Sequence, residues 1–204
     1  MNGIAKKRVA ILISGRGSNM AALIEAAKAP DYPAAIVLVL SNRPDAAGLG
    51  HARTAGIDTV VVDHKAFGQD RQAFEAAIDA ALRAHHIDLV CLAGFMRLLT
   101  PWLVTRWSGR MLNIHPALLP AFKGLDTHRR ALAAGATQHG ASVHFVAAEM
   151  DAGPIILQEA VPVHETDTEA TLAARVLEVE HRIYPQALRL VIEGRAEQMP
   201  ASGR

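Results

Sequence analysis

The 204-residue sequence lacks several features that would assign it to a functional class at once. It has a single cysteine, no long uninterrupted apolar run, and no excess of charge, with 21 Lys and Arg residues against 20 Asp and Glu residues. The balanced charge argues against a broad nucleic-acid-binding or membrane-surface face. Any phosphate group must therefore be bound by a local site.

The single Cys91 has no partner for an internal disulfide bond and lies in the apolar run 88–93. We expect a buried, reduced thiol, because no base neighbours it in sequence to activate it. The segment 14–17, Ser-Gly-Arg-Gly, interrupts the apolar stretch near the N-terminus. That stretch therefore predicts a strand, neither a signal peptide nor a membrane span, and we expect a cytoplasmic protein.

Short apolar runs alternate with stretches of helical periodicity through the first half of the chain. We expect strands at 9–13, 35–40, 59–62, 89–93 and 111–114, and helices at 18–28, 46–55 and 71–84. Alternation of this kind predicts an α/β, Rossmann-like fold with a mostly parallel central sheet and helices on both faces.

The pattern changes after residue 114. Residues 141–147 and 154–163 predict longer strands that form an antiparallel C-terminal extension. A long helix is expected over 168–193, with Pro185 kinking or interrupting it, before a polar and frayed tail at 197–204. No repeat or linker divides the chain, so we expect a single domain over 1–204.

An amide and an imidazole share one edge of the strand that ends near residue 115. Side chains alternate along a strand, so Asn113 and His115 point the same way. Together they could stabilise and protonate an oxygen that gains charge during a reaction. The alternative is that both are strand-end residues satisfied by loop backbone, and it is the better interpretation of an isolated Asn-x-His.

The first loop, 14–19, lies between a buried strand and the start of a helix. Its glycines and the free amides of the helix N-terminus suit an anion, although Ser18 or Asn19 could equally serve only as helix caps. The third glycine of the dinucleotide fingerprint and the Walker A lysine are missing. A single phosphate ester is therefore the better expectation.

Two further segments and the histidines have weaker signals. The cluster Phe95-Met96-x-Leu98-Leu99 follows a strand, where α/β folds form clefts, but such clusters are more often core. Asp151 lies in a turn and would favour a charged His115 if the fold brought the two together. The 10 His residues show no convincing metal-site spacing. His128 and His144 are candidates for a supporting role, although burial or ordinary surface exposure is the better interpretation of both.

The order and spacing of six segments resemble the phosphoribosylglycinamide formyltransferase family over nearly the whole chain. These segments are 11–19, 92–99, 113–120, 139–146, 151–156 and 180–185. The Asn-x-His-Pro strand and the Asp-x-Gly-Pro turn are shared with other formyl-folate enzymes. The Gly-Ser-Asn loop and the Glu-His segment carry more information about the acceptor.

The resemblance implies transfer of a formyl group from 10-formyltetrahydrofolate to the amine of glycinamide ribonucleotide, a step of purine biosynthesis, with no metal. It implies a catalytic trio of Asn113, His115 and Asp151. It implies that Gly17, Ser18 and Asn19 hold the ribonucleotide phosphate and that Glu180 contacts the same substrate. The implied folate contacts are Arg71, Met96, Arg97, Leu98, Leu99, Asn113 and Asp151, with the turn 149–151 closing over the pterin.

The resemblance also sets expectations for organisation and partners. The phosphate loop would lie in the N-terminal half, and the folate site and catalytic residues in the C-terminal half. The partners would be the two small-molecule substrates, with no nucleic acid and no membrane, in a monomer or homodimer. Segment 121–126 varies within the family, so we assign no roles there.

Three alternatives remain to be tested against this interpretation. A hydrolase would release formate from the same folate, but we expect no room for its usual N-terminal regulatory domain, because the first strand begins near Arg8. A methionyl-tRNA formyltransferase normally has an added C-terminal domain and would need an electrostatic footprint for tRNA. A non-catalytic binding module would not need Asn113, His115 and Asp151 together.

Overall fold

The computed structural model describes residues 6–196, and the tail at 197–204 that we expected to fray lies outside the described residues. The chain forms two compact units, unit 1 up to Leu112 and unit 2 from Asn113 onward. The single-domain organisation expected for 1–204 stays a prediction. None of the helices within residues 6–196 has both the length and the apolar character needed to cross a membrane.

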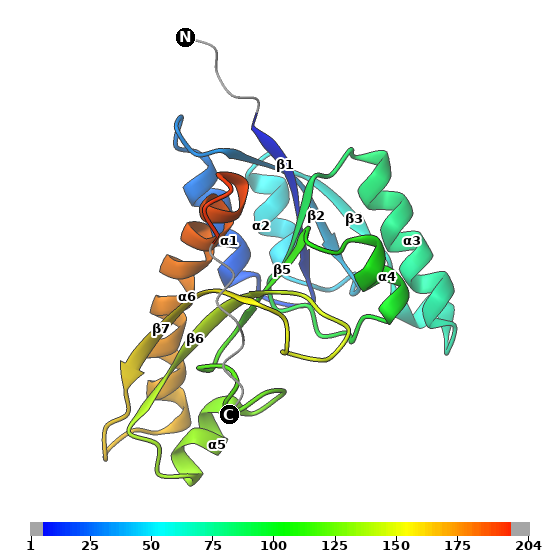
Figure 1. The fold of residues 1–204 in the computed structure, drawn as a ribbon. Coiled ribbons are helices and arrows are strands. Elements are labelled where there is room, and N and C mark those ends of the chain that lie inside the picture. The colour runs from blue at the N-terminus through cyan, green and yellow to red at the C-terminus, as the bar shows by residue number, and fades with distance from the viewer. Residues whose placement is uncertain (1–5, 197–204) are drawn as a thin grey trace. The chain divides into compact units, whose positions relative to one another are not determined.

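A parallel sheet forms the centre of unit 1. Its strands follow the order β3-β2-β1-β4, and all three pairings between neighbours are parallel (Figure 1). Apolar residues fill β1 and β4 almost without interruption, as expected of strands covered on both faces. The bounds are β1 Lys7–Ile13, β2 Ala34–Ser41, β3 Asp58–Val61 and β4 Leu89–Leu92.

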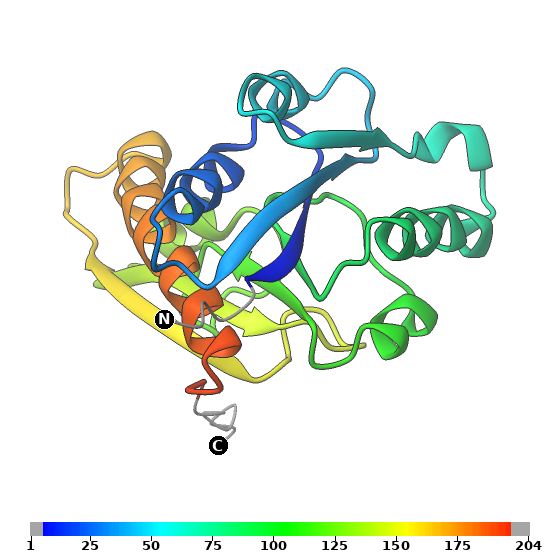
Figure 2. The same ribbon diagram turned by 90° about the horizontal axis from the view of Figure 1, so that it is seen from above.

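Helices cover both faces of this sheet. Figure 2 shows α1 and α2 over one face and α3 and α4 over the other. The chain order requires this arrangement, because successive right-handed crossovers run outward from β1 to β3 and then return past β1 to β4. The bounds are α1 Ser18–Ala27, α2 Gly48–Thr54, α3 Arg71–Ala84 and α4 Pro101–Arg106, with a 3₁₀ turn at His64–Phe67.

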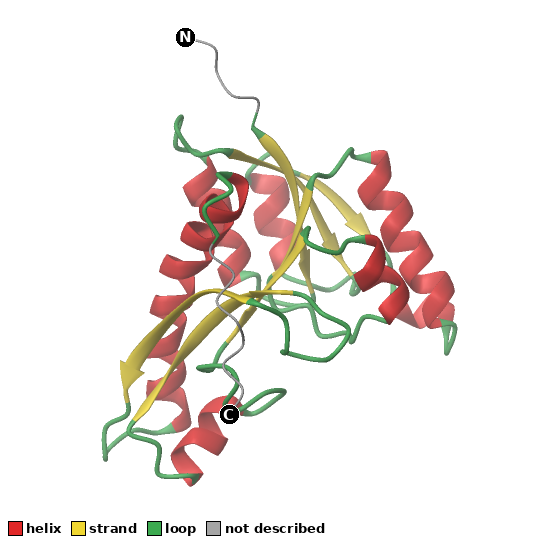
Figure 3. Ribbon diagram, in the orientation of Figure 1, coloured by secondary structure: helices red, strands yellow, loops and turns green. Residues whose placement is uncertain are grey.

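Unit 2 is built on an antiparallel pair of long strands with a long helix beside it (Figure 3). Along β7 buried and more exposed positions alternate, because one side packs on α6 and the other does not. The strand β5 begins in unit 1 and continues into unit 2, where β6 is its neighbour. The bounds are β5 Met111–His115, α5 Thr127–Ala133, β6 Gln138–Phe145, β7 Ile155–Pro162 and α6 Glu169–Ile192.

The α/β fold class predicted from the sequence is confirmed, with parallel strands first and antiparallel strands at the C-terminal end. Helix α6 runs through Pro185 without interruption, so the interruption that we allowed there does not occur. Helix α4 was not predicted, since it has only six residues, too few to show periodicity. Cys91 is fully buried in β4, as expected.

Close backbone contact between β6 and β7 at Gly140 gives a test of this packing. A Cβ atom there would lie 2.1 Å from the carbonyl oxygen of Glu159, which is β7 backbone that cannot simply rotate away. We expect Gly140→Ala to lower the free energy of unfolding by roughly 2–3 kcal/mol in urea denaturation.

The matched control is Gly50→Ala on α2, where a Cβ atom meets nothing within 4 Å. Replacing a helical glycine by alanine at an open position should be neutral or stabilise by about 0.5–1 kcal/mol. Equal losses from both substitutions would contradict the tight strand contact.

Candidate active site

The amide and the imidazole that begin the site lie on β5 in unit 2. Asn113 is half-buried, and His115 is 5% exposed. They are two residues apart on a strand, so their side chains leave the same face. Burial of both groups means that their polar atoms must find partners within the protein or a ligand.

Both ring nitrogens of His115 face protein oxygens. Nε2 donates to the carbonyl oxygen of Phe122 at 3.0 Å, and Nδ1 lies 3.5 Å from Oδ2 of Asp151. The first contact is a hydrogen bond of ordinary length, whereas the second is a close approach without a hydrogen bond, which becomes an ion pair only when the ring is protonated. The Phe122 bond therefore fixes the ring with its Nε2 protonated, and Nδ1 is the nitrogen left for chemistry.

Asp151 is held by a turn of unusual backbone geometry. Its φ of +52° is in the left-handed region, which aspartate tolerates better than most residues. Its Oδ2 accepts a 2.9 Å hydrogen bond from the backbone N–H of Gly124. Two residues on, a Cβ atom at Gly153 would lie 1.8 Å from the carbonyl oxygen of Phe145, so only glycine permits the turn to pack here.

His144 links the amide to the carboxylate. Its Nδ1 donates to the carbonyl oxygen of Phe145 at 2.8 Å. Its Nε2 lies 3.2 Å from Nδ2 of Asn113 and 3.6 Å from Oδ1 of Asp151. With Nδ1 protonated, Nε2 accepts from the Asn113 amide, which orients that amide and leaves its second N–H free to donate elsewhere.

Burial and charge act in opposite directions on the two titratable partners. Burial lowers the pKa of His115, and this outweighs the Phe122 carbonyl and the Asp151 charge, which raise it. We expected Asp151 to raise the pKa of His115 and keep the ring charged. That expectation is wrong in its net direction, because desolvation of the ring is the larger effect.

The carboxyl group of Asp151 behaves differently from the ring beside it. Burial alone would raise its pKa, but the imidazoles of His144 and His115 and the hydrogen bond from the Gly124 amide hold the pKa below its usual range. Asp151 is therefore ionised, whereas the neighbouring His115 ring is neutral over a wider pH range than an exposed histidine.

The loop that follows His115 is fixed by a buried serine and a glutamine. The hydroxyl of Ser142 donates to the Ala117 carbonyl at 2.6 Å and accepts from the Leu119 amide at 3.1 Å. The side chain of Gln158 donates to the same hydroxyl and to the Leu119 carbonyl. This network sets the path by which the chain leaves the catalytic strand.

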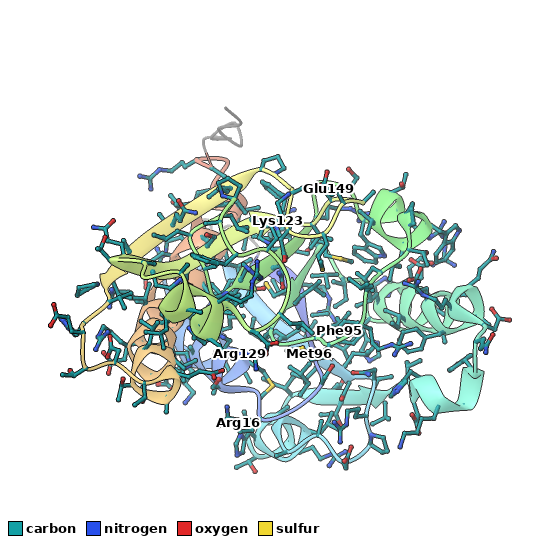
Figure 4. All side chains as sticks on the ribbon, turned by 90° about the horizontal axis from the view of Figure 1, so that it is seen from below. Arg16, Phe95, Met96, Lys123, Arg129 and Glu149 are labelled. Atoms are coloured by element: carbon teal, nitrogen blue, oxygen red, sulfur yellow. The ribbon has the colours of Figure 1, made fainter. Side chains whose placement is uncertain are left out.

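A cavity of about 240 Å³ opens beside the turn that carries Asp151 in unit 2. Lys123 pairs with Glu149 at 3.0 Å and connects the two loops that border it; both side chains are labelled in Figure 4. The lining residues are Leu119, Pro120, Lys123, Glu149, Asp151, Ala152, Gly153 and Ile155.

A larger cavity, of about 490 Å³, lies within unit 1 around the first loop. Gly17 has a φ of +78°, which only glycine adopts readily, and it turns the chain into α1. The hydroxyl of Ser14 accepts from the Met96 amide at 2.7 Å and so fixes the loop after β4 to the loop after β1. The expected phosphate residues Gly17, Ser18 and Asn19 line this cavity together with Met96 and Arg97.

Among the remaining expected folate residues of unit 1, Arg71 at the start of α3 contacts the segment after β4. Arg71 donates to the Leu98 carbonyl at 2.5 Å. Met96, labelled beside Phe95 in Figure 4, and Leu98 are 67% and 65% exposed, which is high for apolar side chains outside a binding surface.

The structure thus brings together Asn113, His115 and Asp151 in unit 2, and the phosphate-loop residues with Met96 and Arg97 in unit 1. Glu180 is buried on α6 in unit 2. Within residues 6–196, no group of three or more His, Cys, Asp or Glu side chains is arranged to hold a metal ion.

Sequence reasoning left out the segment 121–126, which supplies two contacts to the site. The Phe122 carbonyl binds His115, and the Gly124 amide binds Asp151. Both are backbone groups, which every residue carries, so side-chain identity gives no signal for them. Only the glycine at 124, with a φ of +81°, could have indicated a constrained loop.

Buried neutral histidines predict that the protein is destabilised by acid. Burial, together with the charges of His128 and His115, lowers the pKa of His139 to about 4, and the Pro116 carbonyl only partly offsets this. Between about pH 6.5 and pH 4 the unfolded chain, with a histidine pKa of about 6.5, binds a proton that the folded protein does not bind. Stability is then lost as pH falls from about 6.5 toward 4.

We expect His139→Phe to remove this part of the pH dependence. Urea unfolding at pH 7 and pH 4.5 should show the loss of stability reduced by on the order of 2 kcal/mol relative to wild type. An unchanged loss in the variant would show that His139 is not the group responsible.

The chain matches the formyl transferase family model over residues 7–188. It is 46% identical to phosphoribosylglycinamide formyltransferase from Escherichia coli over 187 residues, which cover 92% of this chain and 88% of that protein. It is 54% identical over 189 residues, 93% of this chain, to the human trifunctional purine biosynthetic protein adenosine-3, but it covers only 19% of that protein's length.

A solved structure agrees with these sequence relations. Glycinamide ribonucleotide transformylase 1 from Symbiobacterium toebii superposes with a TM-score of 0.90 at 48% identity, covering 93% of this chain and 89% of that one. The family match spans most of the chain and includes β5, β6 and the turn that holds Asp151. The chain therefore belongs to the formyl transferase family.

Proposed function

We propose that this protein transfers a formyl group from 10-formyltetrahydrofolate to the amine of glycinamide ribonucleotide, giving formylglycinamide ribonucleotide and tetrahydrofolate. One observation carries the proposal: in a formyl transferase chain, Asn113, His115 and Asp151 meet in one buried network joined through His144. An amide donor, a titratable ring and an ionised carboxylate are the groups that acyl transfer to an amine requires.

The first step forms a bond between the amine nitrogen and the formyl carbon. The electron pair of the carbonyl moves onto oxygen and creates a tetrahedral intermediate with a negative charge. Asn113 has one N–H directed to His144, which leaves the other to donate to this oxygen. A donor already oriented costs no reorganisation as the charge develops, so it stabilises the transition state more than the substrate.

The second step moves one proton from the attacking nitrogen to the leaving nitrogen. His115 is neutral at the start, and its Nδ1 accepts the proton of the former amine. Asp151 and the adjacent oxyanion then stabilise the charged ring. His115 returns the proton to the folate nitrogen as the bond between that nitrogen and the formyl carbon breaks, and it ends in its original state.

The binding roles are proposed on the same basis. The cavity of unit 1 supports Gly17, Ser18 and Asn19 as ligands of the ribonucleotide phosphate, because backbone amides at the start of α1 suit an anion. We assign Glu180 to the same substrate. The exposed apolar surface of Met96 and Leu98, with Arg71, Arg97 and Leu99, would border the folate.

We further propose that the enzyme works in the cytoplasm as one functional domain, as a monomer or homodimer, with the two small-molecule substrates as its partners. We assign neither a nucleic acid nor a membrane as a partner. The formal charge of +1 supports this, because it provides no broad basic surface.

A spectrophotometric assay of folate product, run with and without glycinamide ribonucleotide, tests the reaction itself. We expect product only when the amine is present. Release of formate without the amine would assign the hydrolase instead, and absence of any product with both substrates would favour a binding module.

Substitutions in the network test the assigned roles. We expect Asn113→Ala and His115→Ala each to lower kcat roughly 100- to 1000-fold, because each removes a group that acts on charge or protons in the transition state. Circular dichroism and thermal melting should show that both variants are folded.

The matched control is His85→Ala at the end of α3, where the ring only caps a helix through the Ala81 carbonyl. Its turnover should equal that of wild type. Near wild-type turnover in purified His115→Ala would instead remove His115 from the mechanism.

A further inference from the structure

The direction of one backbone carbonyl determines how the catalytic ring is held. Nε2 of His115 donates to the oxygen of Phe122, a residue in a segment between β5 and α5. Phe122 has a φ of +54°, in the left-handed region that a bulky side chain rarely adopts. A conformation of this kind persists only when the surrounding structure enforces it.

Two side chains contact the Phe122 ring and hold the segment in this conformation. The ring of His139 meets the ring of Phe122 edge to face, with centroids 5.8 Å apart and an angle of 78° between the planes. The guanidinium of Arg130 lies 5.7 Å from the same ring and donates to the Lys123 carbonyl at 2.6 Å. His139 thus contacts the Phe122 side chain from β6, while Arg130 fixes the backbone that follows.

A histidine at position 139 lowers the stability of the fold. His139 is 1% exposed, and neither ring nitrogen makes a hydrogen bond of ordinary geometry within residues 6–196, although the Pro116 carbonyl is close enough to raise its pKa. Its other ring neighbour, His128, meets it edge to face at 5.2 Å. A leucine would fill the same volume without burying two unpartnered nitrogens, so stability alone gives no reason for an imidazole ring here.

We propose that His139 is a positioning residue for the reaction: its flat, buried ring supports Phe122 so that the Phe122 carbonyl accepts from Nε2 of His115 and leaves Nδ1 as the working nitrogen. The inference rests on the proposed function. It assigns His139 no contact with substrate and no proton transfer.

Loss of this support has two consequences for His115. Without the carbonyl, the proton is free to sit on either nitrogen, so a smaller fraction of the enzyme presents an unprotonated Nδ1. The carbonyl also favours the charged ring, so its loss lowers the pKa of His115 below its already reduced position. The other charged and titratable groups around His115 are Asp151, His144, Arg130, His128 and His139 itself, and they are unchanged except for the substituted residue.

The test compares two substitutions at one position. His139→Leu removes the flat ring, and we expect kcat to fall about tenfold while KM for both substrates stays within twofold. The acid limb of the pH profile of kcat should move to lower pH, because the neutral form of His115 persists to lower pH. His139→Phe keeps a flat ring without the nitrogens. It should retain most of the wild-type turnover, and the acid limb of its pH profile should lie at the wild-type position.

The control for general loosening is His85→Leu at the end of α3, which also removes a partly buried imidazole, one that bonds the Ala81 carbonyl far from the segment 121–126 in sequence. It should leave both kcat and the acid limb unchanged. A positioning role is overturned if His139→Leu keeps the wild-type turnover and limb, or if His139→Phe loses as much turnover as His139→Leu.

A second variant covers the case in which His139→Leu fails to fold. Phe122→Leu removes the other ring of the same contact from a half-buried site, and it should reproduce the loss of kcat and the shift of the limb. In the double variant the two tenfold losses should not multiply to a hundredfold, because both act through one contact.

Failure of this inference is distinguishable from failure of the proposed function. If wild-type protein forms no product with both substrates, the proposed function is wrong. If wild type is active and neither Phe122→Leu nor His139→Leu alters turnover or the limb, the proposed function stands and the positioning role is wrong.

Discussion

The carboxylate of Asp151 is the interaction on which the catalytic half of this protein depends. It is ionised, nearly buried, and surrounded by His115, His144 and the amide of Gly124, which come from β5, β6 and the segment before α5. A buried charge of this kind is tolerable only when hydrogen bonds and opposite charges surround it. The positive φ of Asp151 and the glycine two residues later are the backbone conditions that place it there.

The partners of each ring explain why the neighbouring histidines have different tasks. His144 uses Nδ1 on the Phe145 carbonyl and Nε2 on the Asn113 amide, so it serves as an orienting group. His115 has one nitrogen committed to Phe122 and one facing Asp151, which suits a ring that gains and loses a proton. His139 faces other rings and no acceptor of ordinary geometry, and burial keeps it neutral.

Sequence reasoning predicted the parts of the fold that repeat a local pattern. Continuous apolar runs predicted β1 and β4, and helical periodicity predicted α3 with its correct bounds, because burial imposes these patterns residue by residue. Helix α4 was missed because it is too short to show a period. In the site, the pairing of Asn113 with His115 followed from strand alternation, but their link through His144 depends on how β6 packs, which no local pattern records. The pKa of His115 was predicted in the wrong direction, because proximity to Asp151 could be anticipated and the depth of burial could not.

The segment 121–126 bears on how variation among relatives should be interpreted. It contributes an oxygen and an N–H from its main chain to the catalytic centre, and these are atoms that every residue carries. Such a segment can change the side chains at its other positions and still serve the site, provided that Phe122 and Gly124 keep their positive φ and that the number of peptide units and their path are kept. An insertion or deletion of a single residue would displace both contacts at once, whereas several simultaneous substitutions could leave them in place. In this part of the molecule, length is under stricter constraint than composition.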